Sequence, residues 1–307
     1  MARPSRKSAS TRPDIHTQIT NQIIEAIEQG AGDWQMPWHR TGEGLNRPLN
    51  ADTGNAYRGI NVLSLWVAAE VRGFSTGLWG TYRQWQAKGA QVRKGEKASL
   101  VIFYKEYDAE DVDTETGETT DGKRRFARAS YVFNADQVDG YERPEPPVAI
   151  NPVEAIDQAD AFIRSTGAKI SHGGDRAYYR PSSDSIQMPE PSRFLGTPTS
   201  SATECYYSTL LHELTHWTGH AKRCDRQFGE RFGDEAYAME ELVAELGAAF
   251  LCADLGIALT PRPDHAAYID HWLKVLKADN RAIFTAAAQA AKAGEFLEKL
   301  QSVTKAA

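Results

Sequence analysis

The residues with the clearest chemistry lie in the stretch LLHELTHWTGH, where His212, Glu213 and His216 form the pattern H-E-x-x-H. On a helix, two histidines four residues apart lie on one face about 6 Å apart along the axis, so both imidazoles can reach a single metal ion. Glu213 would then lie beside the ion, where its carboxylate can accept a proton from a water molecule that the ion has acidified. This combination predicts zinc-dependent hydrolysis of peptides.

The flanking residues favour a helix that is held in place by a core. Gly219 follows the motif as a helix terminator. The apolar side chains near the motif recur so as to form a buried face. These apolar residues are Leu210, Leu211, Leu214 and Trp217, and a polar start is supplied by Ser200, Ser201 and Glu204.

A catalytic zinc site needs a third protein ligand and an open fourth position. We expect Glu241 as the third ligand, from an amphipathic helix over residues 238–251, and Glu245 as a hydrogen-bond partner of a ligand histidine. Glu240 is predicted to point elsewhere, although it stays open as the alternative ligand. A solvated helix face is the other interpretation of these carboxylates. Small side chains would let the two helices approach closely, namely Ala244, Gly247 and Ala248.

One class of metallopeptidase is disfavoured by the residues after the motif. A metzincin has its third ligand histidine six residues after the second histidine, and Lys222 occupies that position here. A glutamate-ligand zincin is therefore the better class, and His220 is expected to support the structure or a ligand rather than bind metal. The expected cofactor is one divalent ion, with zinc as the first choice and manganese as the alternative.

Composition places the chain among globular proteins of the cytoplasm. The 307 residues suit two domains, and 41% hydrophobic and 25% charged residues are ordinary values. No apolar stretch could span a bilayer, and the basic, Ser-rich residues 1–13 have no apolar h-region after them, so we expect a disordered arm and no membrane partner. Three cysteines without a C-x-x-C pair favour a reducing compartment.

The N-terminal part combines positive charge with aromatic residues. Residues 1–105 contain 14 Lys and Arg against 8 Asp and Glu, and five of the seven tryptophans lie between Trp34 and Trp85. Single-stranded nucleic acid is bound by such pairs, because aromatic faces stack on bases and cations follow phosphates. The alternative is that the tryptophans build a core, which is what we expect of Trp66. The candidate DNA-binding residues are Trp38, Arg40, Tyr57, Arg58, Trp79, Tyr82, Arg83, Arg93, Lys94 and Lys97.

The pattern of elements predicts an α+β fold with two domains, an N-terminal α+β domain (14–140) and a C-terminal one (153–307), joined by a Pro-rich linker (141–152). Helices are expected from Ile15 to just before the stop signal Gly30 and over 61–71, 82–88, 152–165, 234–254, 264–278 and 280–301, besides the metal helix. Paired strands are expected over 98–107 and 126–134, with 108–125 as a hairpin tip, and short strands over 168–171, 177–180 and 184–188.

Long motifs in order along the chain resemble ArdC-type antirestriction proteins. They are PW (37–38), TGNAYRGIN (53–61), WGTYRQW (79–85), VRKGEK (92–97), AYYRPSSDSIQMP (177–189), HELTHWTGH (212–220) and EELVAELGAAFL (240–251). The resemblance implies an N-terminal domain that binds single-stranded DNA and a C-terminal zincin-like (gluzincin-type) metallopeptidase domain. It also implies that His212, His216 and Glu241 bind metal, that Glu213 is the catalytic glutamate, and that the protein protects incoming plasmid or phage DNA from host restriction.

Two functions of different classes remain open. In the first, bound DNA brings the peptidase near a host restriction or DNA-processing protein, which it cleaves. In the second, the protein only coats single-stranded DNA, and the metal domain is structural or inactive. Glu213 favours the first, because a structural site has no use for a general base. The absent signal segment disfavours a third interpretation, a secreted protease.

Overall fold

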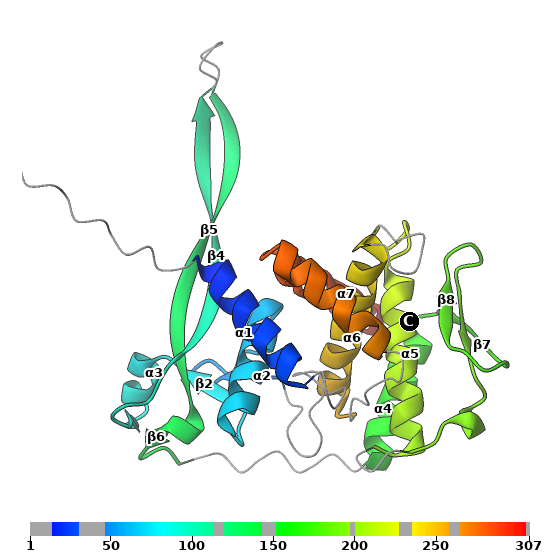
Figure 1. Ribbon diagram of the computed structural model, residues 1–307, viewed down its shortest axis with the longest axis horizontal. Helices are drawn as coiled ribbons and strands as arrows, with labels where there is room; N and C mark the ends of the chain where they lie inside the picture. Colours follow the sequence, from blue (N-terminus) through cyan, green and yellow to red (C-terminus); the bar gives the residue numbers. More distant parts are fainter. Residues whose placement is uncertain are drawn as a thin grey trace, which may run out of the picture.

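The computed structural model describes residues 14–30, 47–112, 119–142, 152–196, 200–226, 235–257 and 265–304. The predicted arm (1–13), residues 143–151 of the predicted linker, and two of the predicted DNA-binding residues, Trp38 and Arg40, lie outside the described residues. Helices and strands are combined in an α+β fold, as predicted (Figure 1).

The N-terminal part consists of three helices and six strands within the described residues. They are α1 (Ile15–Gly30), β1 (Leu49–Asn50), α2 (Ile60–Arg72), β2 (Leu78–Gly80), α3 (Tyr82–Ala87), β3 (Gln91–Val92), β4 (Ser99–Val112), β5 (Thr119–Asn134), the 3-10 turn η2 (Ala135–Gln137) and β6 (Val138–Asp139). The three predicted helices are confirmed within one or two residues at each end. Thr81 caps α3 in a reciprocal capping box with Gln84, which fixes where that helix begins.

One long strand pair dominates this part of the molecule. β4 and β5 are antiparallel from Ser99↔Val132 to Val112↔Thr119, and they project from the body in Figure 1. The prediction of a hairpin tip over 108–125 was therefore wrong, because both strands continue well into that stretch. The acidic, Gly- and Thr-rich composition suggested a loop, but backbone pairing does not depend on an apolar face. The complete sheet has the order β1-β2-β5-β4.

The C-terminal part packs helices beside a small sheet. Its elements are α4 (Pro152–Ser165), β7 (Lys169–His172), β8 (Tyr178–Arg180), β9 (Ser185–Met188), the 3-10 turn η3 (Pro191–Arg193), α5 (Ala202–Thr218), α6 (Glu235–Leu255), α7 (His265–Ala278) and α8 (Ala282–Thr304). In the sheet, β9 lies between β7, which is parallel to it, and β8, which is antiparallel. Apart from η3, for which no element was predicted, these helices and strands match the predicted ones closely. No helix in the described ranges has the length and apolar character needed to cross a membrane.

The two parts share one apolar core. Ile19, Ile23 and Ile27 follow the four-residue period of α1 and are at most 1% exposed. Figure 1 shows α1 between α2 and α7, and Thr20 donates a hydrogen bond of 2.6 Å to the carbonyl oxygen of Asn280, just before α8. Buried residues of α1, α2, α5, α6 and α8 form a single cluster. The structure therefore joins the segments on the two sides of the predicted linker through their interiors.

Small side chains bring α5 and α6 together, as predicted. Ala244 and Ala248 of α6 are 0% and 1% exposed. A Cβ atom on Gly247 would lie 2.7 Å from Oγ1 of Thr215 on α5, closer than van der Waals contact allows. The absence of a side chain at Gly247 thus sets the separation of the two helices, and this separation positions their functional side chains relative to one another.

Candidate metal centre

Helix α5 presents the H-E-x-x-H residues from a fixed and buried position. Ser201 caps the helix in a reciprocal capping box with Glu204, as the predicted polar start requires. His212, Glu213 and His216 are 3%, 3% and 8% exposed. Burial of polar side chains costs free energy unless they have hydrogen-bond or ionic partners. The partners of these three residues therefore indicate what the site does.

Two histidines and one glutamate converge on a single point. Nε2 of His212 lies 3.2 Å from Nε2 of His216, and the two oxygens of Glu241 lie 3.5 Å from these nitrogens, Oε2 from His212 and Oε1 from His216. The three residues can each offer one ligand atom within a group no more than 4.8 Å across. The triad comes from two consecutive helices, α5 and α6.

The spacing of these atoms fits a divalent ion. A tetrahedral ion at about 2.0 to 2.1 Å from each ligand separates the ligand atoms by about 3.3 Å. The 3.2 Å between the two Nε2 atoms agrees with this value, and each Nε2 atom lies 3.5 Å from one oxygen of Glu241. Two imidazole nitrogens and a carboxylate are also the donor set of glutamate-ligand zinc enzymes. Binding of an ion by His212, His216 and Glu241 stays a prediction, and the geometry is compatible with it.

Charge at this site favours an additional cation. Burial alone would lower the pKa of His216, but the carboxylates of Glu241 and Glu240 outweigh burial and raise that pKa to about 10. The same histidines hold the pKa of Glu241 far below its usual range, against the effect of burial. The carboxylates thus bind positive charge strongly, as a proton on His216 or as an ion.

The role of Glu240 differs from the predicted one. It was expected to point elsewhere, but its Oε1 accepts a 3.0 Å hydrogen bond from Nδ1 of His216. Arg226 donates to both carboxylate oxygens of Glu240, from Nη2 at 2.8 Å and from Nε at 2.9 Å. Glu240 therefore orients a predicted ligand instead of lying apart from the site. Arg226 was not among the predicted residues.

Two other predicted supporting residues have weaker contacts with the triad. Oε2 of Glu245 lies 3.7 Å from Nδ1 of His212, which is too long for a hydrogen bond, and Nδ1 has no hydrogen-bond partner in the described part of the chain. Nδ1 of His220 accepts a hydrogen bond from the amide of Lys222, in the turn after α5. Among the described contacts, His220 therefore belongs to this turn and not to the metal triad.

Most of the described candidate DNA-binding residues are at the surface, but two aromatic ones are not. Tyr57 and Trp79 are only 5% and 1% exposed, so the expectation that they present an open face was wrong. Trp79 belongs to β2, inside the four-stranded sheet, and its ring packs 5.8 Å from that of Phe74. The hydroxyl of Tyr57 accepts a hydrogen bond from the side chain of Asn50. Trp66, at 2% exposed, is in the core as predicted.

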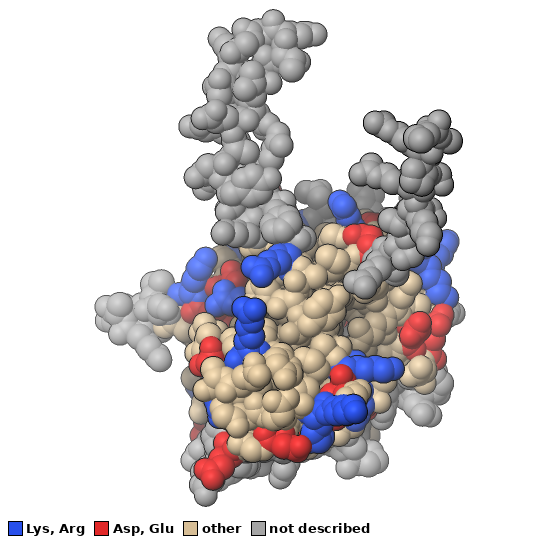
Figure 2. Space-filling view, turned by 90° about the vertical axis from the view of Figure 1, so that its left-hand side faces the viewer, with Lys and Arg blue, Asp and Glu red and all other residues tan. Residues whose placement is uncertain are grey.

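The candidate cations of this region fall into two groups. Arg83, Lys94 and Lys97 are exposed. Arg58 and Arg93 are exposed but paired, Arg58 with Glu295 at 3.0 Å and Arg93 with Glu96 at 3.0 Å. Figure 2 shows Lys and Arg around a broad uncharged area on this face, with acidic residues among them and along the lower edge.

Exposed aromatic residues that the sequence analysis missed lie along β4 and β5. Tyr104 and Tyr131 are 53% and 55% exposed, and the predicted Tyr82 is 41% exposed. Tyr131 and Phe133 are two residues apart on β5 and share one side of the sheet. Tyr104 is paired with Ala127, an even number of residues from Tyr131, and is on the same side. We call Tyr82, Tyr104, Tyr131 and Phe133 the aromatic strip.

Comparison with known proteins places the chain among antirestriction proteins. A family model described as the N-terminal domain of anti-restriction factor ArdC matches residues 13–133, and one described as a zincin-like metallopeptidase matches residues 157–289. Crystal structures of antirestriction protein ArdC from plasmid R388, described as metal-free and as Mn(II)-bound, have TM-scores of 0.73 and 0.71 to this structure. Sequence identities are 40% and 38%, covering 94% of this chain and 98% of each of those chains.

The chain belongs to the ArdC antirestriction family.

Two further relatives of this ArdC-family chain differ in length. Uncharacterized protein y4eC of Sinorhizobium fredii (strain NBRC 101917 / NGR234) is 48% identical over 299 residues, which are 96% of this chain and 95% of that protein. DNA primase TraC of Escherichia coli is 38% identical over 306 residues, which are 94% of this chain but 27% of the primase. Sequence similar to this chain therefore makes up nearly all of one relative and about a quarter of the other.

The two family matches divide the functional residues between them. The zincin-like match contains His212, Glu213, His216 and Glu241, and the ArdC N-terminal match contains the aromatic strip. The family comparison thus agrees with the sequence motifs in the order of the two parts. Arg226 also lies within the zincin-like match, although no motif in the sequence drew attention to it.

Proposed function

We propose that this ArdC-family protein is a metal-dependent peptidase that also binds single-stranded DNA. The observation that supports the enzymatic part best is the triad of His212, His216 and Glu241, whose ligand atoms lie within 4.8 Å of one another. The Mn(II)-bound description of the R388 ArdC crystal structure supports a divalent ion. The triad suits zinc, and manganese is the alternative because imidazole and carboxylate ligands also accept it.

A bound ion would act as a Lewis acid for the peptide carbonyl and would acidify a water molecule at its open position. Glu213 follows the first ligand on α5 and is 3% exposed. In this proposal its carboxylate accepts the proton of the attacking water and then delivers it to the leaving amine. His212, His216 and Glu241 hold the site, and their burial excludes bulk water. We propose a protein bound near the same DNA as the substrate class, such as a host restriction or DNA-processing protein.

Substitution of Glu213 separates the enzymatic proposal from the alternative. We expect Glu213→Gln to retain metal and to lose protection of incoming DNA in a plasmid-transfer assay into a restricting host. His220→Ala is the matched control, because this residue lies in the turn after α5 and contacts the Lys222 amide. Full protection by Glu213→Gln would contradict the peptidase and would favour a protein that acts by coating DNA.

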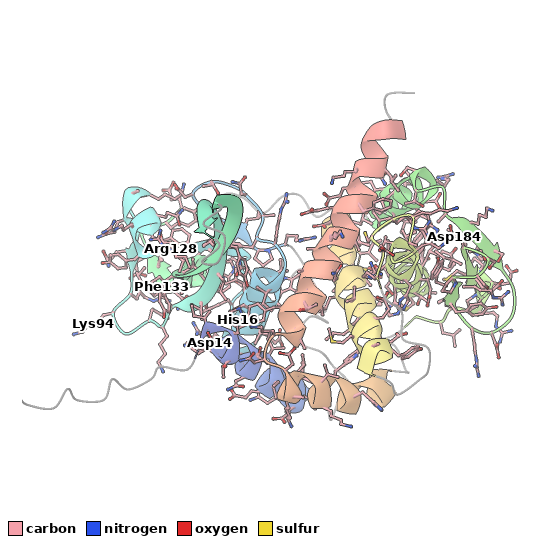
Figure 3. The ribbon with its side chains drawn as sticks, turned by 90° about the horizontal axis from the view of Figure 1, so that it is seen from above. Asp14, His16, Lys94, Arg128, Phe133 and Asp184 are labelled. Atoms are coloured by element: carbon pink, nitrogen blue, oxygen red, sulfur yellow. The ribbon has the colours of Figure 1, made fainter. Side chains whose placement is uncertain are left out.

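DNA binding is supported by the aromatic strip. Three of its four rings are more than 40% exposed, and the rings of Tyr82 and Phe133 meet edge to face at a centroid distance of 6.5 Å. Exposed rings can stack on successive bases at about 1 to 3 kcal/mol each. Phe133 and the exposed Lys94 lie at the same end of the molecule in Figure 3, where a cation can contact phosphates between stacked bases.

Sequence preference and salt dependence test this surface. We expect binding to single-stranded DNA with little sequence preference, because stacking and phosphate contacts are both tolerant of sequence. Affinity should fall as salt rises, since cations that bind phosphates release counterions. Fluorescence anisotropy with single-stranded and duplex oligonucleotides measures both effects. Equal affinity for duplex, or affinity that does not change with salt, would contradict this part of the proposal.

A further inference from the structure

Two adjacent glutamates on α6 approach the same histidine pair. Glu241 faces the Nε2 atoms of both histidines at 3.5 Å, and Glu240 accepts from Nδ1 of His216 at 3.0 Å. A free carboxylate so close to a divalent ion would compete for it. The structure must therefore contain something that keeps Glu240 in its own position.

Arg226 has the contacts needed for this task. It is 8% exposed and forms a bidentate pair with Glu240. Its guanidinium also donates to the carbonyl oxygen of Thr215 at 2.7 Å and to Oγ1 of Thr218 at 2.8 Å. Both threonines lie in the last turn of α5, the helix that carries the two histidines. Arg226 is thus anchored to the ligand helix while it binds the carboxylate from α6.

We propose that Arg226 is a positioning residue for the metal centre, which reserves Glu240 for His216 and thereby directs Nε2 of His216 toward the ion. This inference rests on the metal-dependent function proposed above. With both oxygens bound to the guanidinium, Glu240 can accept the Nδ1 proton but cannot turn to the ion. A proton fixed on Nδ1 leaves the lone pair of Nε2 as the ligand.

Electrostatics and positioning predict opposite results for the loss of this arginine. Removal of a positive charge near a divalent ion would by itself strengthen binding of the ion. Loss of positioning would weaken it, because residues that orient ligands typically contribute about 10- to 100-fold to metal affinity. The sign of the change therefore identifies the role of Arg226.

The same loop provides a matched control. Arg223 also donates to an α5 carbonyl oxygen, that of Trp217 at 2.6 Å, and it also pairs with a carboxylate. Its partner is Asp184, to which Nη1 donates at 3.0 Å to Oδ2 and Nη2 donates to Oδ1, and the described contacts of Asp184 do not include the triad. Arg223→Met therefore removes the same charge and a similar hydrogen bond to an α5 carbonyl oxygen, and it leaves the contact of Arg226 with Glu240 in place.

The experiment measures zinc and cobalt affinity of the full chain by competition with a chelator, alongside thermal unfolding of the metal-depleted protein. We expect Arg226→Met and Glu240→Gln each to lower affinity by about 10- to 100-fold. The double variant should be no weaker than the weaker single variant, because Arg226 acts through Glu240. Arg223→Met should lower the unfolding temperature and leave affinity unchanged. Arg226→Lys, which keeps the charge without the bidentate geometry, should also bind metal more weakly and serves if Arg226→Met does not fold.

Unchanged or tighter metal binding by the Arg226 variants would overturn the inference, and so would an equal loss in Arg223→Met. Failure of the proposed function has a different signature. In that case the wild-type chain itself would bind no divalent ion, or His216→Ala would bind it as tightly as the wild type.

Discussion

The metal centre and the aromatic strip are built in different ways. At the metal centre, His212 and His216 are 3% and 8% exposed and their positions follow from helical spacing within five residues of sequence. In the strip, Tyr104 and Tyr131 are more than half exposed and are on one side of the sheet only through the register of β4 and β5. Buried chemistry therefore leaves a local pattern in the sequence, whereas an exposed surface of paired strands leaves almost none.

Loss of the proposed third ligand, Glu241, should give the largest effect on metal affinity. It tests directly which buried glutamate binds the ion. A residue that orients a ligand typically contributes about 10- to 100-fold to metal affinity. We expect Glu241→Gln to lower metal affinity by more than this. Glu240→Gln should stay within that range, because Glu240 contacts His216 through Nδ1. Chelator competition on the two variants makes the comparison. A greater loss in Glu240→Gln would exchange the roles of the two glutamates.

Trp79 tests where the core ends and the binding surface begins. At 1% exposure, Trp79→Ala should lower the free energy of unfolding by about 3 to 5 kcal/mol. DNA affinity at a temperature where the variant is folded should change little. Urea unfolding and anisotropy measure the two properties. A stable variant with weakened DNA binding would restore the sequence-based interpretation of this tryptophan.

Tyr131 is the corresponding test of the strip. We expect Tyr131→Ala to weaken single-stranded DNA binding by about tenfold or more, as the loss of one stacked base requires, with little change in unfolding temperature. Phe103→Ala is the matched control, because Phe103 is 47% exposed on the same strand pair but faces the other side. Equal losses of DNA affinity in the two variants would contradict the proposal that DNA binds on the Tyr131 side of the sheet.

A smaller effect is expected at the junction of the β8–β9 turn with α5. The guanidinium of Arg223 lowers the pKa of Asp184 to about 2, against the effect of burial. Because this folded-state pKa lies below the unfolded value, the pair stabilises the protein at pH above about 4 and loses its contribution as the pH falls toward 2. Asp184 is partly exposed, so we expect less than about 1 kcal/mol. Asp184→Asn should reduce the difference in stability between pH 6 and pH 3, and an unchanged difference would contradict the assignment.

The sequence predicted the helices and the shared face of His212 and His216 because both depend on short-range spacing, whereas metal binding by these residues and Glu241 stays a prediction. It did not predict the place of Trp79, since Gly80 after it suggested a loop. A Cβ atom on Gly80 would lie 3.0 Å from the ring of Trp85, so this glycine permits close packing in the sheet.

The contact between Arg226 and Glu240 could not be predicted from the sequence for a different reason. Helical periodicity gives the angle between Glu240 and Glu241 on α6 but not the rotation of α6 relative to α5. Arg226 lies after α5 in a segment with no periodic pattern. Only the packing of the two helices shows which glutamate faces Nε2 and which faces Nδ1.

The most direct test of the central claim is the metal content of the purified full-length protein. The account predicts one divalent ion per chain in the wild type and in His220→Ala, and none in His212→Ala or His216→Ala. His212, His216 and His220 are spaced by four residues each. The comparison therefore distinguishes a histidine that binds the ion from one that is only close to the motif in sequence. Wild-type metal content in His216→Ala, or loss of the ion in His220→Ala, would contradict the account.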